Sequence, residues 1–173
     1  MSVVAILFLL LVVYQLKHFL ADYVLQGEYM LGKFKPGWDF LKPLLAHVGV
    51  HGVMTFAIAS TLLHGSHLGY AVLIGLFDAT VHFFMDRIKA SPAYMGRWKP
   101  LTAAEWLAAK ETVRAPCLGD ACGGLCDYYD ADGAQQKLRG NKLFWWALGF
   151  DQAVHHLTHY ACVYFILKIG GLL

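Results

Sequence analysis

Four apolar segments, each long enough to cross a membrane, constrain this 173-residue chain more than any other feature. A helix needs about 20 mostly apolar residues to span roughly 30 Å of hydrocarbon. The four segments of about this length are residues 3–26, 43–63, 68–88 and 143–167. The whole chain is 58% hydrophobic and only 15% charged. These features predict an all-α, polytopic membrane protein that folds as one four-transmembrane-helix bundle over residues 1–173.

Two other interpretations of the segments are less favoured. A helix of a soluble bundle needs a polar face toward water, whereas these four segments are apolar all round. A cleaved signal peptide begins with basic residues and ends at a small-x-small site. The first segment has neither feature, so we expect it to be retained as a helix.

The distribution of basic residues predicts the orientation of the bundle. Twelve of the 14 Lys and Arg residues lie in or beside the connections 27–42 and 89–142, whereas the turn 64–67 has none. Cytoplasmic connections carry the excess of Lys and Arg. We therefore expect a multi-pass protein of the bacterial inner membrane, with both charged connections in the cytoplasm and both termini on the periplasmic side.

The connection 89–142 is the one long polar region. A capping box (Thr-x-x-Glu) opens a short amphipathic helix over 102–113. Cys117, Cys122 and Cys126 follow in a Gly-rich loop. Thiols stay reduced in the cytoplasm, so we expect either free thiols or a second metal site in which a nearby aspartate completes the ligand set of a zinc ion.

Polar residues inside the four apolar segments repeat one spacing. Side chains four residues apart leave the same face of a helix, one turn apart. The strongest pairs are His18/Asp22, His47/His51, His82/Asp86 and Asp151/His155, and Asp78 and His159 extend two of them by a further turn. With the orientation predicted from Lys and Arg, the four pairs all lie in the cytoplasmic half of the bundle. We expect them to meet in its interior.

Buried aspartates in a membrane need partners, because each costs at least about 2.5–3.5 kcal/mol near the bilayer centre. His and Asp side chains together are ligands for divalent ions, zinc first, with iron or manganese as alternatives. The eight residues of the four pairs exceed the four ligands of a single zinc ion. We therefore predict an intramembrane, dinuclear metal site, as in bundles that hold two ions between facing helices. A hydrogen-bonded polar core and a proton relay are the alternatives.

The remaining polar residues of the segments are assigned by their depth and angle. Asp78 and His159 lie one turn deeper than the pairs, where they would orient the ligands or face the substrate as catalytic groups. His156 points about 100° away from His155 and is expected to contact a neighbouring helix instead. His64 and His67 lie in the outer turn and are expected to be solvated.

The same motifs resemble a known family, the "domain of unknown function 3307" membrane proteins of bacteria and their phages. That family shows H-x3-D, H-x3-H, H-x3-D and D-Q-x2-H in this order. The matching stretches are HFLADYVLQ, HVGVHGV, HFFMDRIK and GNKLFWWALGFDQAVHH, in all four segments. The resemblance supports the predicted site residues but implies no reaction. By analogy only, the chain is also similar to small membrane proteins described as metal-dependent hydrolases.

The predicted site favours a metal-dependent hydrolase that acts on a membrane lipid or a lipid-linked substrate. Three alternatives remain: a transporter or channel for divalent cations or protons, a di-iron membrane oxygenase, and a structural protein whose helices are held together by a bound metal. The outer halves of the segments contain almost no polar residues, which disfavours a permeation path. No run of Lys or Arg indicates nucleic acid. The sequence is compatible with a homo-oligomer and does not fix the oligomeric state.

Overall fold

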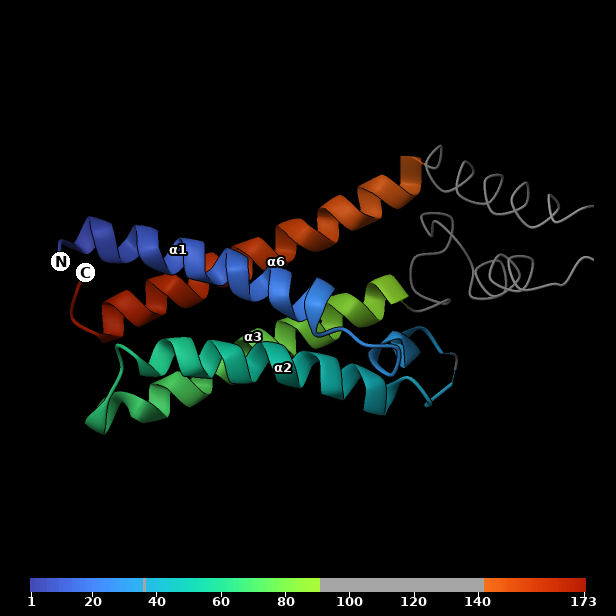
Figure 1. Cartoon of the computed structure of the whole chain (residues 1–173), viewed down its shortest axis with the longest axis horizontal. Helices are drawn as coiled ribbons and strands as arrows, with labels where there is room; N and C mark the ends of the chain where they lie inside the picture. The colour runs from blue at the N-terminus through green and yellow to red at the C-terminus, as the bar shows by residue number, and fades with distance from the viewer. Residues whose placement is uncertain (36, 91–141) are drawn as a thin grey trace, which may run out of the picture.

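The computed structural model describes residues 1–35, 37–90 and 142–173, in which four long helices lie along one common direction (Figure 1). They are α1 (Val3–Phe19), α2 (Leu41–Ser60), α3 (Leu68–Ala90) and α6 (Lys142–Ile169). The described part of the chain has no strand, which confirms the predicted all-α fold. The N- and C-termini lie at the same end of the bundle (Figure 1).

Three of these helical stretches are long and apolar enough to cross a membrane: Val3–Val24, Leu41–Ser60 and Leu68–Lys89. Helix α6 is longer but carries Asp151, Gln152 and three histidines in its middle, and its membrane crossing stays a prediction. The amphipathic helix predicted at 102–113 and the three cysteines of the following loop lie outside the described residues.

Helix α1 continues into a π-helical turn at Leu20–Val24 before the chain reverses. At the start of α1, the Ser2 side chain accepts a hydrogen bond from the backbone N–H of Ala5, as an N-cap does. A π turn widens the helix by one residue per turn and is frequent at functional sites. Here it carries Asp22, one of the predicted ligands.

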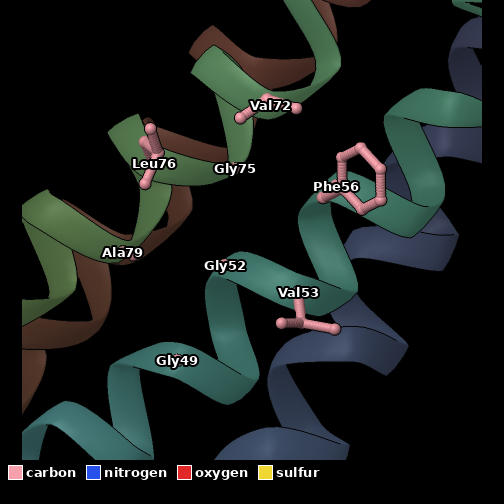
Figure 2. A pocket seen from close by; sticks show the side chains of 8 residues that line it. All are labelled: Gly49, Gly52, Val53, Phe56, Val72, Gly75, Leu76 and Ala79. Carbon is pink, nitrogen blue, oxygen red and sulfur yellow. The ribbon is translucent and has the colours of Figure 1, made fainter. Parts of the chain in front are cut away.

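Helices α2 and α3 pack closely because glycines lie between them (Figure 2). A Cβ atom added to Gly75 would lie 2.8 Å from the Gly52 carbonyl oxygen, and one added to Gly52 would lie 3.0 Å from the Ala79 Cβ. Neither position therefore has room for a larger residue unless the helices move apart. Beside this contact the two helices leave an apolar crevice of about 360 Å³, which Phe56 and Val72 help to line (Figure 2).

The interior of the bundle is divided along its length into an apolar half and a polar half. The apolar half lies near the termini and includes Cys162, which is fully buried, as expected for a small core residue. Its buried residues are Leu10, Tyr14, Ala59, Leu63, Ala71, Ile74, Cys162, Val163, Ile166 and Leu167. Large apolar side chains such as Val53 and Leu73 are instead exposed on the outside, as on helices that face lipid. The polar half contains the candidate site.

Candidate metal centre

A cluster of histidine and aspartate side chains fills the polar half of the bundle. All ten predicted site residues gather there. Nine of them are at most 4% exposed, and the side chain of Asp22 is 17% exposed. The ten are His18, Asp22, His47, His51, Asp78, His82, Asp86, Asp151, His155 and His159. Their roles as ligands or catalytic groups remain predictions.

Several of the contacts in the cluster follow from the spacing of four residues within one helix. His18 Nε2 lies 3.1 Å from Asp22 Oδ2, and His155 Nε2 lies 3.3 Å from Asp151 Oδ1. His82 differs, because its Nδ1 lies 2.9 Å from the Asp78 backbone oxygen and 3.2 Å from Asp78 Oδ1. Its Nε2 is left buried without a hydrogen-bond partner. Each helix therefore presents its predicted pair on one inward face.

Other contacts join helices that are distant in the sequence. His51 Nε2 lies 2.9 Å from Asp22 Oδ1, which joins α2 to the π turn after α1. His47 Nε2 lies 3.1 Å from Asp86 Oδ2 and 3.4 Å from Asp22 Oδ1. His155 on α6 lies 3.7 Å from Asp86 on α3. The four helices are thus joined through imidazole–carboxylate contacts.

The histidine rings also pack against one another at the centre of the cluster. The His82 ring stacks on that of His155, with centroids 4.0 Å apart, and lies 3.9 Å from that of His51. The rings of His47 and His51 are 4.9 Å apart, edge to face. The packed imidazoles provide nitrogen atoms that a divalent ion can use as ligands.

Four groups in the cluster could hold a metal ion, three of which share a histidine with another group, since the candidate ligand atoms within each group lie within 4.8 Å of one another. His51 and His82 each belong to two groups. The groups are His18/His51/His82, Asp22/His47/His51, Asp78/His82/His159 and Asp86/Asp151/His155. All members are buried except Asp22, which is partly exposed. The cluster is therefore able to bind metal, whereas the identity of the ion is not fixed by these residues.

Sequence reasoning missed three lysines that enter the cluster and pair with its carboxylates. Lys17 Nζ lies 2.6 Å from Asp78 Oδ2. The other two ion pairs are Lys33–Asp86 at 2.9 Å and Lys89–Asp151 at 2.7 Å. Only the lysine of the last pair is substantially exposed, at 27% of its side chain. The signal for Lys17 was a charged residue inside an apolar run, directly before His18. Lys33 and Lys89 counted only as basic residues of the connections.

Two polar side chains that carry no charge also support the cluster. Thr55 Oγ1 donates a hydrogen bond to Asp78 Oδ2 at 2.5 Å. Gln152 lies with its Oε1 2.9 Å from His18 Nε2, and its Nε2 donates to Asp151 Oδ2 at 3.2 Å. Gln152 is the second residue of the D-Q-x2-H motif, so the motif itself was the signal for this contact.

Of the histidines that we expected to lie outside the site, His156 lies beside it, with its ring 6.3 Å from that of His159, and His64 and His67 lie away from it in the described structure. His156 is partly buried, and its ring lies 5.5 Å from that of His18 on α1, a contact with a neighbouring helix. It belongs to none of the four groups. His64 and His67 are exposed beyond the end of α2.

Comparison with known proteins identifies a family for this chain. A family model described as "Protein of unknown function (DUF3307)" matches residues 6–115. The match includes α1, α2 and α3 with their histidines and aspartates, and it ends before α6. The resemblance read in the D-Q-x2-H motif thus lies outside the matched residues. No curated protein and no solved structure matches the chain significantly.

Proposed function

The chain belongs to the DUF3307 family, and we propose that it is an integral membrane metallohydrolase that acts on a lipid or a lipid-linked substrate. The observation that carries the proposal is the cluster of four His/Asp groups that could hold a metal ion, inside helices of which three are apolar and long enough to span a membrane. Intramembrane ionisable residues that converge in a bundle interior are characteristic of functional sites.

The residues present suit a divalent ion and hydrolytic chemistry. When bound, such an ion activates water and polarises a carbonyl or phosphoryl group. The chain supplies neutral imidazoles and carboxylates as ligands, zinc being the ion that this donor set fits first. His159 stays our candidate for proton transfer near the site, since its Nε2 lies 3.4 Å from Lys17 Nζ, an ammonium that can donate to it. Asp78, held by Lys17 and Thr55, orients His82.

The surroundings of Asp22 support a lipid-derived substrate. Asp22 is the most exposed of the ten site residues. Phe19 and Tyr23, near Asp22 in the chain, stack with their ring centroids 5.5 Å apart, and these side chains are 54% and 65% exposed. A polar group at the edge of an exposed aromatic surface suits a substrate with an apolar tail and a polar reactive group.

A transporter for divalent cations or protons is the second candidate, because buried Lys–Asp pairs in spanning helices also occur along ion pathways. The apolar half of the bundle argues against it. Its ten buried residues include no ionisable side chain apart from Tyr14 and Cys162. Among the described residues the polar cluster therefore does not continue through that half.

The predicted orientation is part of the proposal. Lys33 and Lys89 turn inward to pair with aspartates. Even without these two, the remaining basic residues of the connections lie on one side, so the cytoplasmic assignment of both charged connections stands as a prediction, with both termini on the periplasmic side. Fusions of a periplasm-dependent reporter to either terminus test it, since an inactive reporter at both ends would contradict this orientation.

Metal analysis of the purified protein tests the metal centre. We expect wild-type protein in detergent to retain zinc or another divalent ion in at least equimolar amount. His51→Ala should lose bound metal, because His51 belongs to two of the four groups. His156→Ala is the matched control, a nearby histidine outside all four, and should retain it. Wild-type protein without stoichiometric metal would refute the centre.

Activity is tested on the reconstituted protein. Liposomes of bacterial polar lipids are incubated with wild-type or His51→Ala protein, and released fatty acids or phosphate-bearing products are measured by mass spectrometry. We expect release by the wild type that a chelator abolishes and that the variant lacks. Metal-loaded protein that releases nothing, but moves Zn²⁺ or protons across the liposome membrane, would replace the hydrolase by the transporter.

A further inference from the structure

The four aspartates of the cluster differ in their charge partners. Asp78, Asp86 and Asp151 each have a lysine ammonium within 2.9 Å. Asp22 is the exception, since its ion-pair contacts in the described structure are with His18, His47 and His51, at 3.1, 3.4 and 2.9 Å. The negative charge of three carboxylates is therefore already balanced by the chain, whereas that of Asp22 is not.

This difference in charge partners decides at which aspartate a divalent ion is bound most strongly. A carboxylate that a lysine already pairs attracts a second cation weakly, because the ammonium repels that cation at short range. Coordination there would also require the ammonium to leave a buried site, which exposes its charge to a low-dielectric surrounding. An ion at Asp22 meets one uncompensated carboxylate and three imidazoles with no lysine between them.

The backbone conformation and the exposure of Asp22 also favour Asp22 as the carboxylate that binds the ion. Asp22 lies on the π turn Leu20–Val24, whereas the other three aspartates lie within regular α-helix. Its side chain is 17% exposed, against 0%, 3% and 1% for the side chains of Asp78, Asp86 and Asp151. It is thus the one carboxylate of the cluster that an ion reaches without displacing a buried ion pair.

We propose that the centre binds a single divalent ion at Asp22, with His47 and His51 as the other side-chain ligands, while Lys17, Lys33 and Lys89 keep Asp78, Asp86 and Asp151 out of coordination. The inference rests on the proposed metal centre and deepens it. The ligand atoms of a tetrahedral zinc lie about 3.3 Å apart, as follows from bonds of about 2.0–2.1 Å. Asp22 Oδ1 lies 3.4 Å from His47 Nε2 and 2.9 Å from His51 Nε2, close to that separation, whereas His18 Nε2 contacts the other carboxylate oxygen at 3.1 Å.

On this proposal the lysine-paired aspartates have another task, which is to hold imidazoles that do not bind the ion. Asp78 Oδ1 lies 3.2 Å from His82 Nδ1, and Asp78 is itself held by Lys17. Counting every His and Asp as a ligand predicts two ions, whereas the lysines reduce the available carboxylates to one. The number of ions is therefore a direct consequence of three residues that lie outside the i, i+4 pattern.

One variant of Asp22 and two double variants that keep the net charge of the cluster separate this proposal from its alternatives. Asp22→Asn should abolish binding of added Zn²⁺, measured as metal per protein after desalting in detergent. The double variants Lys33→Met/Asp86→Asn and Lys89→Met/Asp151→Asn remove a whole ion pair each, and both should still bind one equivalent. Co²⁺ in place of Zn²⁺ adds a second readout, since wild type and both double variants should share one tetrahedral absorption spectrum.

Each outcome has a defined meaning. One equivalent of metal in Asp22→Asn, or its loss in either double variant, would overturn the Asp22-centred site while leaving the metal centre itself intact. Two equivalents in wild type would overturn the single ion. No metal in wild type would overturn the centre and this inference together. Should Asp22→Asn fail to fold, as judged by size-exclusion chromatography and circular dichroism, His47→Gln and His51→Gln test the same ligand set, and retention of metal by both would refute it.

Discussion

The ion pair between Lys17 and Asp78 provides a quantitative test of how the cluster is held together. Both side chains are at most 2% exposed, and Nζ and Oδ2 are 2.6 Å apart. Removing one partner of a buried ion pair costs about 3–5 kcal/mol, because the other charge is left uncompensated. Thr55 and His82 still contact Asp78, so we expect Lys17→Met to lie near the lower end of that range.

The loss should be visible as a lower unfolding temperature in detergent. For a chain of this length, about 3 kcal/mol corresponds to a decrease of roughly 6 to 12 °C. A chelator is included throughout, so that bound metal does not contribute to the difference. Lys168→Met is the matched control, since Lys168 is exposed on α6 and bonds only to Tyr164 in the described structure. Its midpoint should stay within about 2 °C of wild type, since surface substitutions usually change stability by less than 0.5 kcal/mol.

The double variant Lys17→Met/Asp78→Asn distinguishes a charge effect from a packing effect. Replacing both charged partners of a buried pair is much less costly than removing one of them. We therefore expect the double variant to be more stable than Lys17→Met alone. A single variant as stable as wild type would show that Asp78 carries no uncompensated charge when Lys17 is removed. A double variant as unstable as the single one would show that packing, and not charge, determines the loss.

Three further predictions concern other parts of the structure. Gly75→Ala places a Cβ atom 2.8 Å from the Gly52 carbonyl oxygen and should lower the free energy of unfolding by about 1–3 kcal/mol through overpacking. Gly69→Ala is the control, since a Cβ atom there meets open space, and it should not destabilise the fold in the same thermal scan. Thr55→Val removes a hydrogen bond to the charged Asp78 and should lower the stability of the protein by about 1.5–3 kcal/mol. Thr61→Val, at an exposed position, is the control, and an equal loss of stability in the two variants would contradict this prediction. Free Zn²⁺ at about 100 times its dissociation constant should stabilise wild-type protein by about 2.7 kcal/mol, which raises its unfolding temperature by roughly 5 to 11 °C. The unfolding temperature of His51→Ala should not rise when Zn²⁺ is added after chelation.

The fold class and the members of the cluster could be predicted from local properties of the sequence. Length and apolar content predict helices wherever about 20 residues avoid water together. A spacing of four residues places His47 and His51 on one face whatever surrounds the helix. The inward direction of that face also follows, since histidines and aspartates are too costly to leave in lipid. His156 could be set apart from His155 by the same angular argument.

The partners of these residues depend on how the helices pack. Lys17, Lys33 and Lys89 pair with aspartates 61, 53 and 62 residues away in the chain, and no periodicity connects positions so distant. The π turn that carries Asp22 also has no signature in the residues LADYV that form it. Which aspartate keeps an unbalanced charge is therefore a property of the tertiary structure.

The gathering of histidines and aspartates at one depth follows from the residues of each segment, because helical period and the cost of burying charge act on each segment separately. The balance of three carboxylates by lysines, with Asp22 surrounded by imidazoles, follows instead from how the helices pack. Electrostatic balance depends on distances between side chains of different helices, and those distances are set by packing such as the close contact at Gly52 and Gly75.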